Sequence, residues 1–205
     1  MGVYRGKPVI GIIGGIGSGK SFVADLFGEF GAMVIHADDT VHSVYRRADV
    51  QNQLRQWWGD DAILPDGNIN RKAVAARIFS NDDERRKLED LIHPLVTAER
   101  IALMEGAGPD VTAFVWDTPL LVETGLHTEC DAVVFVETPE SVRLARVANR
   151  GWSGEELAKR EKLQFPLDRK RDISEYIVSN AADAESARDQ ARQVFSRIQA
   201  KLQPG

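Results

Sequence analysis

The chain has little cysteine, no long hydrophobic run and no surplus of basic residues. Its single cysteine, Cys130, has no partner for an internal disulfide or a CxxC metal pair, which indicates a reducing compartment. No apolar run approaches the roughly 20 residues that a membrane-spanning helix needs, so we expect a cytoplasmic protein without a membrane partner. The net charge of -5 gives no general electrostatic reason to bind nucleic acid. The length of 205 residues suits one α/β domain. The sequence does not determine the oligomeric state.

Short apolar segments alternate with helical patterns along the chain. Residues 7–15, KPVIGIIGG, are continuously apolar, as strands covered on both faces of a parallel sheet tend to be. Four further segments are expected to be strands: 32–35, 111–116, 132–136 and 176–179. A helical pattern starts at Ser21, and Gly31 stands where a helix stop is expected. This alternation predicts an α/β fold with a parallel five-stranded sheet covered by helices.

Two stretches interrupt the predicted core, which comprises residues 7–41, 109–142 and 172–205. Residues 42–108 show helical patterns and turns but no strand, and so predict a helical insertion. Residues 143–171 predict helices and hold nine Arg and Lys against four Asp and Glu in an otherwise acidic chain. An ordinary solvated helical hairpin would explain this charge, but we favour a helical lid that closes over phosphates.

Residues 14–21, GGIGSGKS, match the P-loop pattern G-x-x-x-x-G-K-[ST] between the first strand and its helix. Glycine allows backbone amides to turn toward phosphate oxygens. The ATP-binding residues are therefore expected to be Gly15, Ile16, Gly17, Ser18, Gly19, Lys20 and Ser21. Lys20 is the expected catalytic cation at the β- and γ-phosphates, and the Ser21 hydroxyl is the expected direct ligand of Mg²⁺.

Small-molecule kinases, signalling GTPases and mechanical ATPases share this loop. No Asn-Lys pair occurs, so the chain lacks the N-K-x-D string that reads guanine. Mechanical ATPases usually end a long apolar strand in adjacent acids, whereas residues 111–117 offer only Asp117. A kinase needs a carboxylate near the acceptor hydroxyl, and we favour Asp38, just beyond the predicted strand 32–35. Asp39 is the competing choice, and an N-cap role is the alternative for either.

Six strings occur in order along the chain: GGIGSGKS, VIHAD, DGNINR, LIHPL, DTPLLVE and YIVSN. With them, residues 10–180 resemble the dephospho-CoA kinases, which are P-loop kinases of coenzyme A biosynthesis. The combination of His93-Pro94 with Pro119-Leu120-Leu121 and Glu123 is more specific than the P-loop alone. The resemblance implies transfer of the ATP γ-phosphate to the ribose 3′-hydroxyl of dephospho-CoA, giving CoA and ADP. ATP and dephospho-CoA are then the partners, with Mg²⁺ as cofactor.

The resemblance also implies roles for individual residues. Asp38 falls on the family's proposed catalytic base. Asp117, at the end of a predicted strand, is expected to orient hydrated magnesium through a water. The implied substrate-binding residues are Asp38, Arg71, His93, Pro119 and Leu120, with Leu121 also at the pocket floor. For His93-Pro94, a helix-breaking packing role is the alternative.

In the lid, Arg146 and Arg150 repeat the family's paired-arginine spacing, which places both guanidinium groups on one helical face. Arg146 is the implied catalytic member of this pair, and Arg150 joins the ATP-binding residues. Asn180 falls on an asparagine that lies close to adenine in the family. The positions Arg160, Gln164 and Lys170 match the family as well.

Two departures from the family pattern stand out. His36 replaces the first Asp of the usual D-A-D string, which puts a metal role there in doubt and favours a strand-end residue satisfied by hydrogen bonds. Ser174-Glu175 stands where Ala-Asp is common. Two other functions stay open: a P-loop kinase for another nucleoside, nucleotide or small metabolite, and a nucleotide-dependent switch protein.

Overall fold

The strands expected from the sequence form one parallel sheet in the computed structural model, which describes residues 4–181 and 183–202. The sheet has the order β2-β3-β1-β4-β5. Its strands are β1 (Val9–Gly14), β2 (Ala32–His36), β3 (Ala113–Asp117), β4 (Ala132–Glu137) and β5 (Tyr176–Ser179). This arrangement confirms the predicted α/β class and the parallel five-stranded sheet.

The two faces of β1 explain its continuous apolar sequence. Ile10 and Ile12 are fully buried in a core that also contains Phe27 and Phe195. Gly11 points to the opposite face, where a Cβ atom would lie 2.4 Å from Leu121 Cδ2 and 2.9 Å from Cys130 Sγ. Both faces of the strand are therefore covered, as the continuous run of apolar residues predicts.

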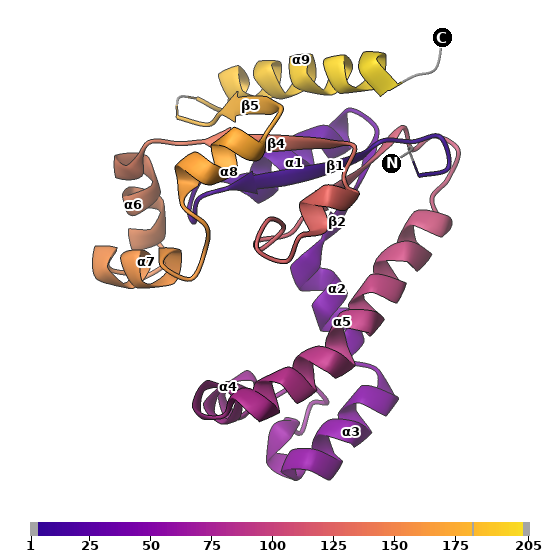
Figure 1. Cartoon of the computed structure of the whole chain (residues 1–205), viewed down its shortest axis with the longest axis vertical. Coiled ribbons are helices and arrows are strands. Elements are labelled where there is room, and N and C mark those ends of the chain that lie inside the picture. The colour runs from indigo at the N-terminus through magenta and orange to yellow at the C-terminus, as the bar shows by residue number, and fades with distance from the viewer. Residues whose placement is uncertain (1–3, 182, 203–205) are drawn as a thin grey trace. The chain divides into compact units, whose positions relative to one another are not determined.

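Helices α1 (Lys20–Glu29) and α9 (Ala184–Leu202) pack against each other and against the sheet (Figure 1). Helix α1 ends as the sequence predicts, because Gly31 follows it with a φ of +98° and donates its amide to Gly28 O. The short helix η2 (Leu126–Glu129) lies between β3 and β4 in the sequence. None of the helices in the described part of the chain is long and apolar enough to cross a membrane.

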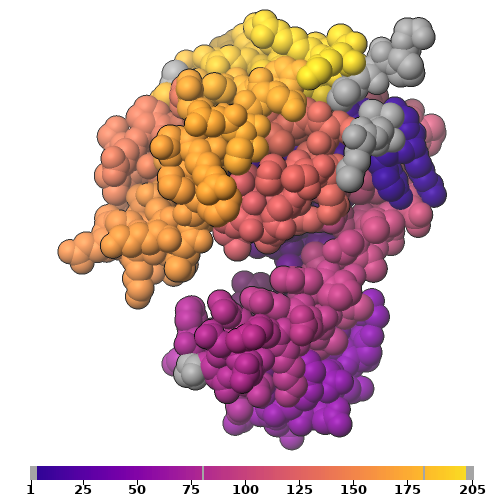
Figure 2. All heavy atoms as spheres, in the orientation of Figure 1, coloured from indigo at the N-terminus to yellow at the C-terminus, as the bar shows by residue number. Residues whose placement is uncertain are grey.

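The basic stretch is helical, as predicted, but its first helix begins three residues earlier. It contains α6 (Glu140–Ala148), α7 (Gly154–Glu161) and α8 (Leu167–Ile173). Helix α8 contacts β1 and β4 and lies across the face of the sheet opposite α1 (Figure 1). In the space-filling view, this orange stretch forms part of the surface of the unit that contains the sheet (Figure 2). We call residues 140–173 the lid segment.

The chain divides into two compact units, of which the first contains the sheet (Met1–His36 and Ala107–Gly205) and the second is Ala37–Gly106. The second unit consists of α2 (Ala37–Tyr45), α3 (Ala48–Trp58), η1 (Asp60–Ala62), α4 (Arg71–Ser80) and α5 (Asp82–Glu105). Its own core includes Val44, Leu54 and Trp58. We expected the helical insertion to begin at residue 42, but the second unit begins at Ala37 because α2 follows β2 directly.

Candidate active site

The segment between β1 and α1 has the backbone that the glycine pattern predicts. Gly17 and Gly19 have φ angles of +77° and +87°, which residues with a Cβ rarely adopt. Gly19 is also crowded, because a Cβ atom there would lie 2.3 Å from Asn180 Nδ2. The loop therefore passes from strand to helix in a conformation that leaves its amides at a helix N-terminus, where anions bind.

Lys20, the first residue of α1, folds back over the loop. Its Nζ donates to Gly15 O at 3.0 Å and to Gly14 O at 3.4 Å. Burial lowers the pKa of Lys20 to about 8, and the positive charges of Lys170 and Arg150 contribute to the lowering, whereas Asp117 opposes it. Lys20 thus lies within electrostatic range of two other cations, and bound phosphate would relieve their repulsion.

The carboxyl ends of β2 and β3 bring two polar side chains, His36 and Asp117, to Ser21 at the start of α1. Ser21 Oγ donates to Asp117 Oδ2 at 2.6 Å, and His36 Nδ1 lies 3.1 Å from the same oxygen. His36 is placed there by strand register, because it pairs with Asp117 across β2 and β3. Magnesium usually takes one or two protein oxygens together with phosphate oxygens and waters, so Ser21 and Asp117 fit this ion. No cluster of three or more His, Cys, Asp or Glu suited to a metal occurs among the described residues.

His36 faces a carboxylate from each of its ring nitrogens. Its Nε2 lies 3.2 Å from Asp25 Oδ1, while Nδ1 faces Asp117. The side chain is therefore held by hydrogen bonds at the strand end, as the sequence favoured. Asp25 was not among the residues expected at the site, although its position four residues after Ser21 on α1 places both side chains on one helical face.

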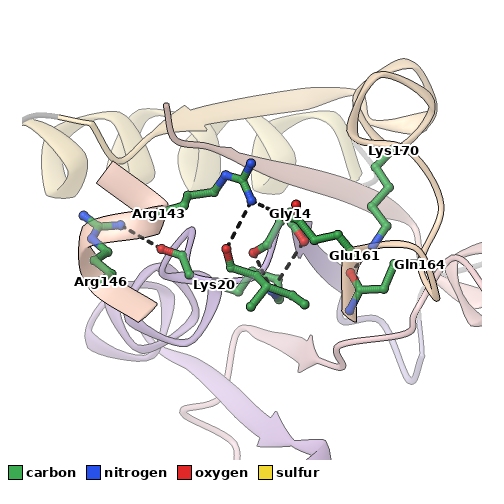
Figure 3. A network of polar contacts seen from close by, with 10 residues as sticks. Gly14, Lys20, Arg143, Arg146, Glu161, Gln164 and Lys170 are labelled. Atoms are coloured by element: carbon green, nitrogen blue, oxygen red, sulfur yellow. Dashed lines mark hydrogen bonds and ion pairs between the residues drawn. The ribbon is translucent and has the colours of Figure 1, made fainter. Parts of the chain in front are cut away.

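The lid segment reaches the loop through Arg146. This side chain donates to Ser18 O and Asn180 O at 3.0 Å each, and to Gly17 O at 3.4 Å. Figure 3 shows Arg146 reaching from α6 to the loop. The Asn180 side chain also donates, from Nδ2 to Ser18 O at 2.8 Å. Thr138, which the sequence reasoning missed, donates to the same carbonyl at 3.0 Å. Arg146 thus contacts the expected P-loop residues through their backbone.

A cavity of about 460 Å³ opens beside these contacts. Its lining includes four predicted ATP-binding residues from three segments, namely Gly17, Gly19, Arg150 and Asn180. The remaining lining residues are Phe22, Arg146, Asn149 and Ala184. The structure therefore brings the two lid arginines and Asn180 to one hollow beside the loop, of a size that suits part of a nucleotide.

A buried ion pair joins the end of the lid segment to the residues after β3. Lys170 is only 1% exposed, and its Nζ lies 2.8 Å from Glu123 Oε1 and 2.9 Å from Gln164 Oε1. Burial alone would raise the pKa of Glu123, but hydrogen bonds from Lys170 and from the Phe165 amide lower it overall. The family positions Gln164 and Lys170 thus contact each other, and Glu123 anchors both segments.

The residues expected near the acceptor fall in two places. Pro119 and Leu120 follow β3 and are exposed, whereas Leu121 is fully buried against Gly11 and so belongs to the core instead of a pocket floor. The others lie in the second unit: Asp38 with Asp39 in the first turn of α2, Arg71 at the start of α4 and His93 in α5. Asp38 lies inside the helix, so it is not the N-cap that we considered.

Helix α5 also corrects one expectation about the second unit. Pro94 lies inside α5, which continues through it from Asp82 to Glu105, so His93-Pro94 does not break a helix. His93 and Arg71 are both exposed. Arg71 lies near the partly buried Tyr45, and it opposes the rise that burial causes in the pKa of that phenol.

A family model described as dephospho-CoA kinase matches residues 8–186. The chain belongs to the dephospho-CoA kinase family. The dephospho-CoA kinase of Aquifex aeolicus is 33% identical over 190 residues, which are 92% of this chain and 96% of that protein. The dephospho-CoA kinase of Corynebacterium efficiens is 34% identical over 198 residues, which are 94% of this chain and 98% of that protein.

Solved structures show the same fold as this member of the dephospho-CoA kinase family. A structure from Thermus thermophilus superposes with a TM-score of 0.82 at 28% identity, covering 97% of this chain and 99% of that one. A dephospho-CoA kinase from Campylobacter jejuni gives 0.70 at 22% identity, covering 95% and 98%. A shikimate kinase from Acinetobacter baumannii gives 0.52 at 18% identity, covering 95% and 94%. The similarities to the Campylobacter jejuni and Acinetobacter baumannii structures show a shared fold alone.

Proposed function

We propose that the chain transfers the γ-phosphate of ATP to the ribose 3′-hydroxyl of dephospho-CoA, giving CoA and ADP, the last step of coenzyme A biosynthesis. Membership of the dephospho-CoA kinase family carries this proposal. The site supports it, because the P-loop, the Ser21–Asp117 pair and the lid arginines meet at the carboxyl ends of the parallel strands. These are the parts that phosphoryl transfer needs: phosphate binding, oxygen ligands for a cation and positive charge.

In this proposal, the first unit holds the nucleotide. The amides of Gly15–Ser21 bind phosphate oxygens, and the buried Lys20 ammonium neutralises the β- and γ-phosphates. Ser21 would hold Mg²⁺ directly and Asp117 would hold it through a water. When bound, Mg²⁺ supplies positive charge beside the phosphates. Arg146 and Arg150 carry further positive charge from the lid segment, and Asn180 lies beside the adenine.

The acceptor is bound by Asp38, Arg71, His93, Pro119 and Leu120 in this proposal. Asp38 orients the 3′-hydroxyl and accepts its proton as the new bond to phosphorus forms. Because phosphoryl transfer has a loose transition state, orienting the hydroxyl is the larger part of that role. Exposed Arg71 and His93 suit contacts to a polar, anionic acceptor, since both side chains donate hydrogen bonds.

The direct test is product analysis by mass spectrometry. Purified protein is incubated with Mg²⁺ and ATP, with dephospho-CoA, adenosine or AMP in separate tubes. We expect one phosphate to be added to dephospho-CoA alone. A phosphorylated adenosine or AMP would replace the proposed acceptor with another, and ADP without any phosphorylated acceptor would favour a nucleotide-dependent switch. Fragmentation of the product locates the new phosphate on the ribose.

A further inference from the structure

Helix α6 contacts the phosphate loop through two arginines on consecutive helical turns. Arg143 Nη1 donates to Ile16 O at 3.3 Å, and Arg146 Nη1 donates to Gly17 O and Ser18 O. Three successive carbonyls of the loop therefore face the lid segment. Arg143 was counted within the basic stretch of the sequence, but neither the pattern nor the family resemblance gave it a role.

Carbonyls held in this way fix the direction of the loop amides. In a planar trans peptide, the C=O of one residue and the N–H of the next point to opposite sides. A carbonyl of Ile16 that faces Arg143 therefore turns the Gly17 amide away from α6, and the Ser18 carbonyl does the same for the Gly19 amide. Ser18 itself donates its amide to Gly15 O within the loop. Arg143 thus acts on the loop from outside, with no contact to phosphate required.

Arg143 is packed tightly enough to hold this position. Its side chain is only 5% exposed. A Cβ atom on Gly15 would lie 3.0 Å from Arg143 Nη1, and one on Gly17 would lie 3.0 Å from Arg143 O. Both the guanidinium and the helix backbone therefore lie directly against the loop. The two glycines are needed for this approach as well as for the loop conformation.

The charge of Arg143 is matched by α7. Glu161, the last residue of α7, forms an ion pair with Arg143 Nη1 (Figure 3). A buried guanidinium without a counter-charge would be strongly destabilising, so Arg143 depends on this carboxylate. One side chain therefore connects the phosphate loop, α6 and α7.

We propose that Arg143, held by Glu161, is a positioning residue that orients the amides of the phosphate loop. Through this residue, the orientation of the amides depends on the position of α7. The inference rests on the proposed binding of ATP at this loop. It assigns Arg143 a role distinct from that of Arg146 and Arg150, which line the nucleotide cavity. Glu161 acts through Arg143, and its loss weakens phosphate binding.

The test is titration calorimetry of the full chain with MgADP and, separately, AMP. We expect Arg143→Gln and Glu161→Gln each to weaken ADP binding about tenfold, the loss that fits one charge-assisted hydrogen bond. AMP, which lacks a β-phosphate, is expected to bind as it does to the unaltered chain. Glu155→Gln is the matched control, because Glu155 is exposed on the same helix.

The double variant Arg143→Gln/Glu161→Gln separates positioning from folding. Thermal unfolding should show Glu161→Gln less stable than the double variant, because only the single change leaves a buried charge unpaired. ADP affinity should stay low in the double variant although its stability recovers. Recovery of ADP affinity together with stability would overturn the inference, as would tighter ADP binding by Glu161→Gln. Failure of the unaltered chain to bind ADP would instead overturn the proposed function.

Discussion

Replacing Lys170 with Met should strongly destabilise the first unit. The ammonium is 1% exposed and lies 2.8 Å from Glu123 Oε1, so its removal leaves a largely buried carboxylate without its counter-charge. Breaking a buried ion pair at one partner costs about 3–5 kcal/mol. In a chain of this size, each kcal/mol shifts the melting temperature by about 2–4 °C. The expected fall in melting temperature at pH 7 is therefore roughly 6–20 °C, measured by differential scanning calorimetry.

The pH dependence of this effect provides a second check. The folded-state pKa of Glu123 is depressed below its ordinary value of 4.5. A depressed carboxyl pKa contributes stability above the unfolded-state value and loses it as the pH falls through the folded-state value. The melting-temperature difference between the unaltered chain and Lys170→Met should therefore narrow below about pH 4.5.

Two variants serve as controls for this reasoning. Arg169→Met removes an exposed cation from the same helix and should leave the melting temperature nearly unchanged. Glu123→Gln/Lys170→Met removes both charges and should be more stable than Lys170→Met alone. A fall of less than about 2 °C for Lys170→Met, or a difference that does not depend on pH, would refute the reasoning.

Three other changes test the site and the core. Asp38→Asn should leave ATP binding intact but slow transfer about a hundredfold or more in a coupled ADP assay, whereas Asp39→Asn should not; equal losses would remove Asp38 as the base. In the protein without ATP the pKa of Lys20 is about 8, so about half of the Lys20 side chains are neutral at pH 8. Bound phosphate favours the charged form, and ATP binding at pH 8 should therefore take up about half a proton per chain. Calorimetry in buffers of different ionisation enthalpy measures this uptake, which Lys20→Met should abolish. Gly11→Ala should lower stability by about 1–3 kcal/mol in denaturant titrations, since the new Cβ would meet Leu121; unchanged stability would contradict the packing described.

The strands were predictable because continuous apolar runs carry their own signal, and β5 begins and ends at the expected residues. The strand boundaries that are set by pairing with another strand were less predictable. Residues 111 and 112 were expected in a strand, but β3 begins at Ala113, which pairs with the first residue of β2. The amide of Thr112 instead donates to Gly31 O. Pairing with a distant strand, which local sequence does not encode, decided where β3 begins.

The phosphate loop was predictable from its glycines, whereas its supports were not. The Arg143–Glu161 and Glu123–Lys170 pairs join residues 18 and 47 positions apart, without a local pattern that links them. His36 was expected to be satisfied by hydrogen bonds, but its partner Asp117 follows only from the register of β2 and β3. We expected Asp38 to belong to the core that contains the sheet. It lies on α2 instead, and α2 belongs to the second unit because residues such as Val44 pack into the core of that unit.

The carbonyl of Ser18 has a consequence for how this loop tolerates mutation. It accepts hydrogen bonds from Thr138, Arg146 and Asn180, which follow β4, lie on α6 and follow β5. A main-chain oxygen is unchanged by substitution, so a small residue at position 18 keeps this hydrogen-bond acceptor. Substitutions at the three donor residues instead remove the hydrogen bonds that hold the loop. A phosphate loop grafted onto another sheet would therefore need these three donors as well as its glycines. In a library screened for nucleotide binding, the distant donors should be as intolerant of change as the loop itself.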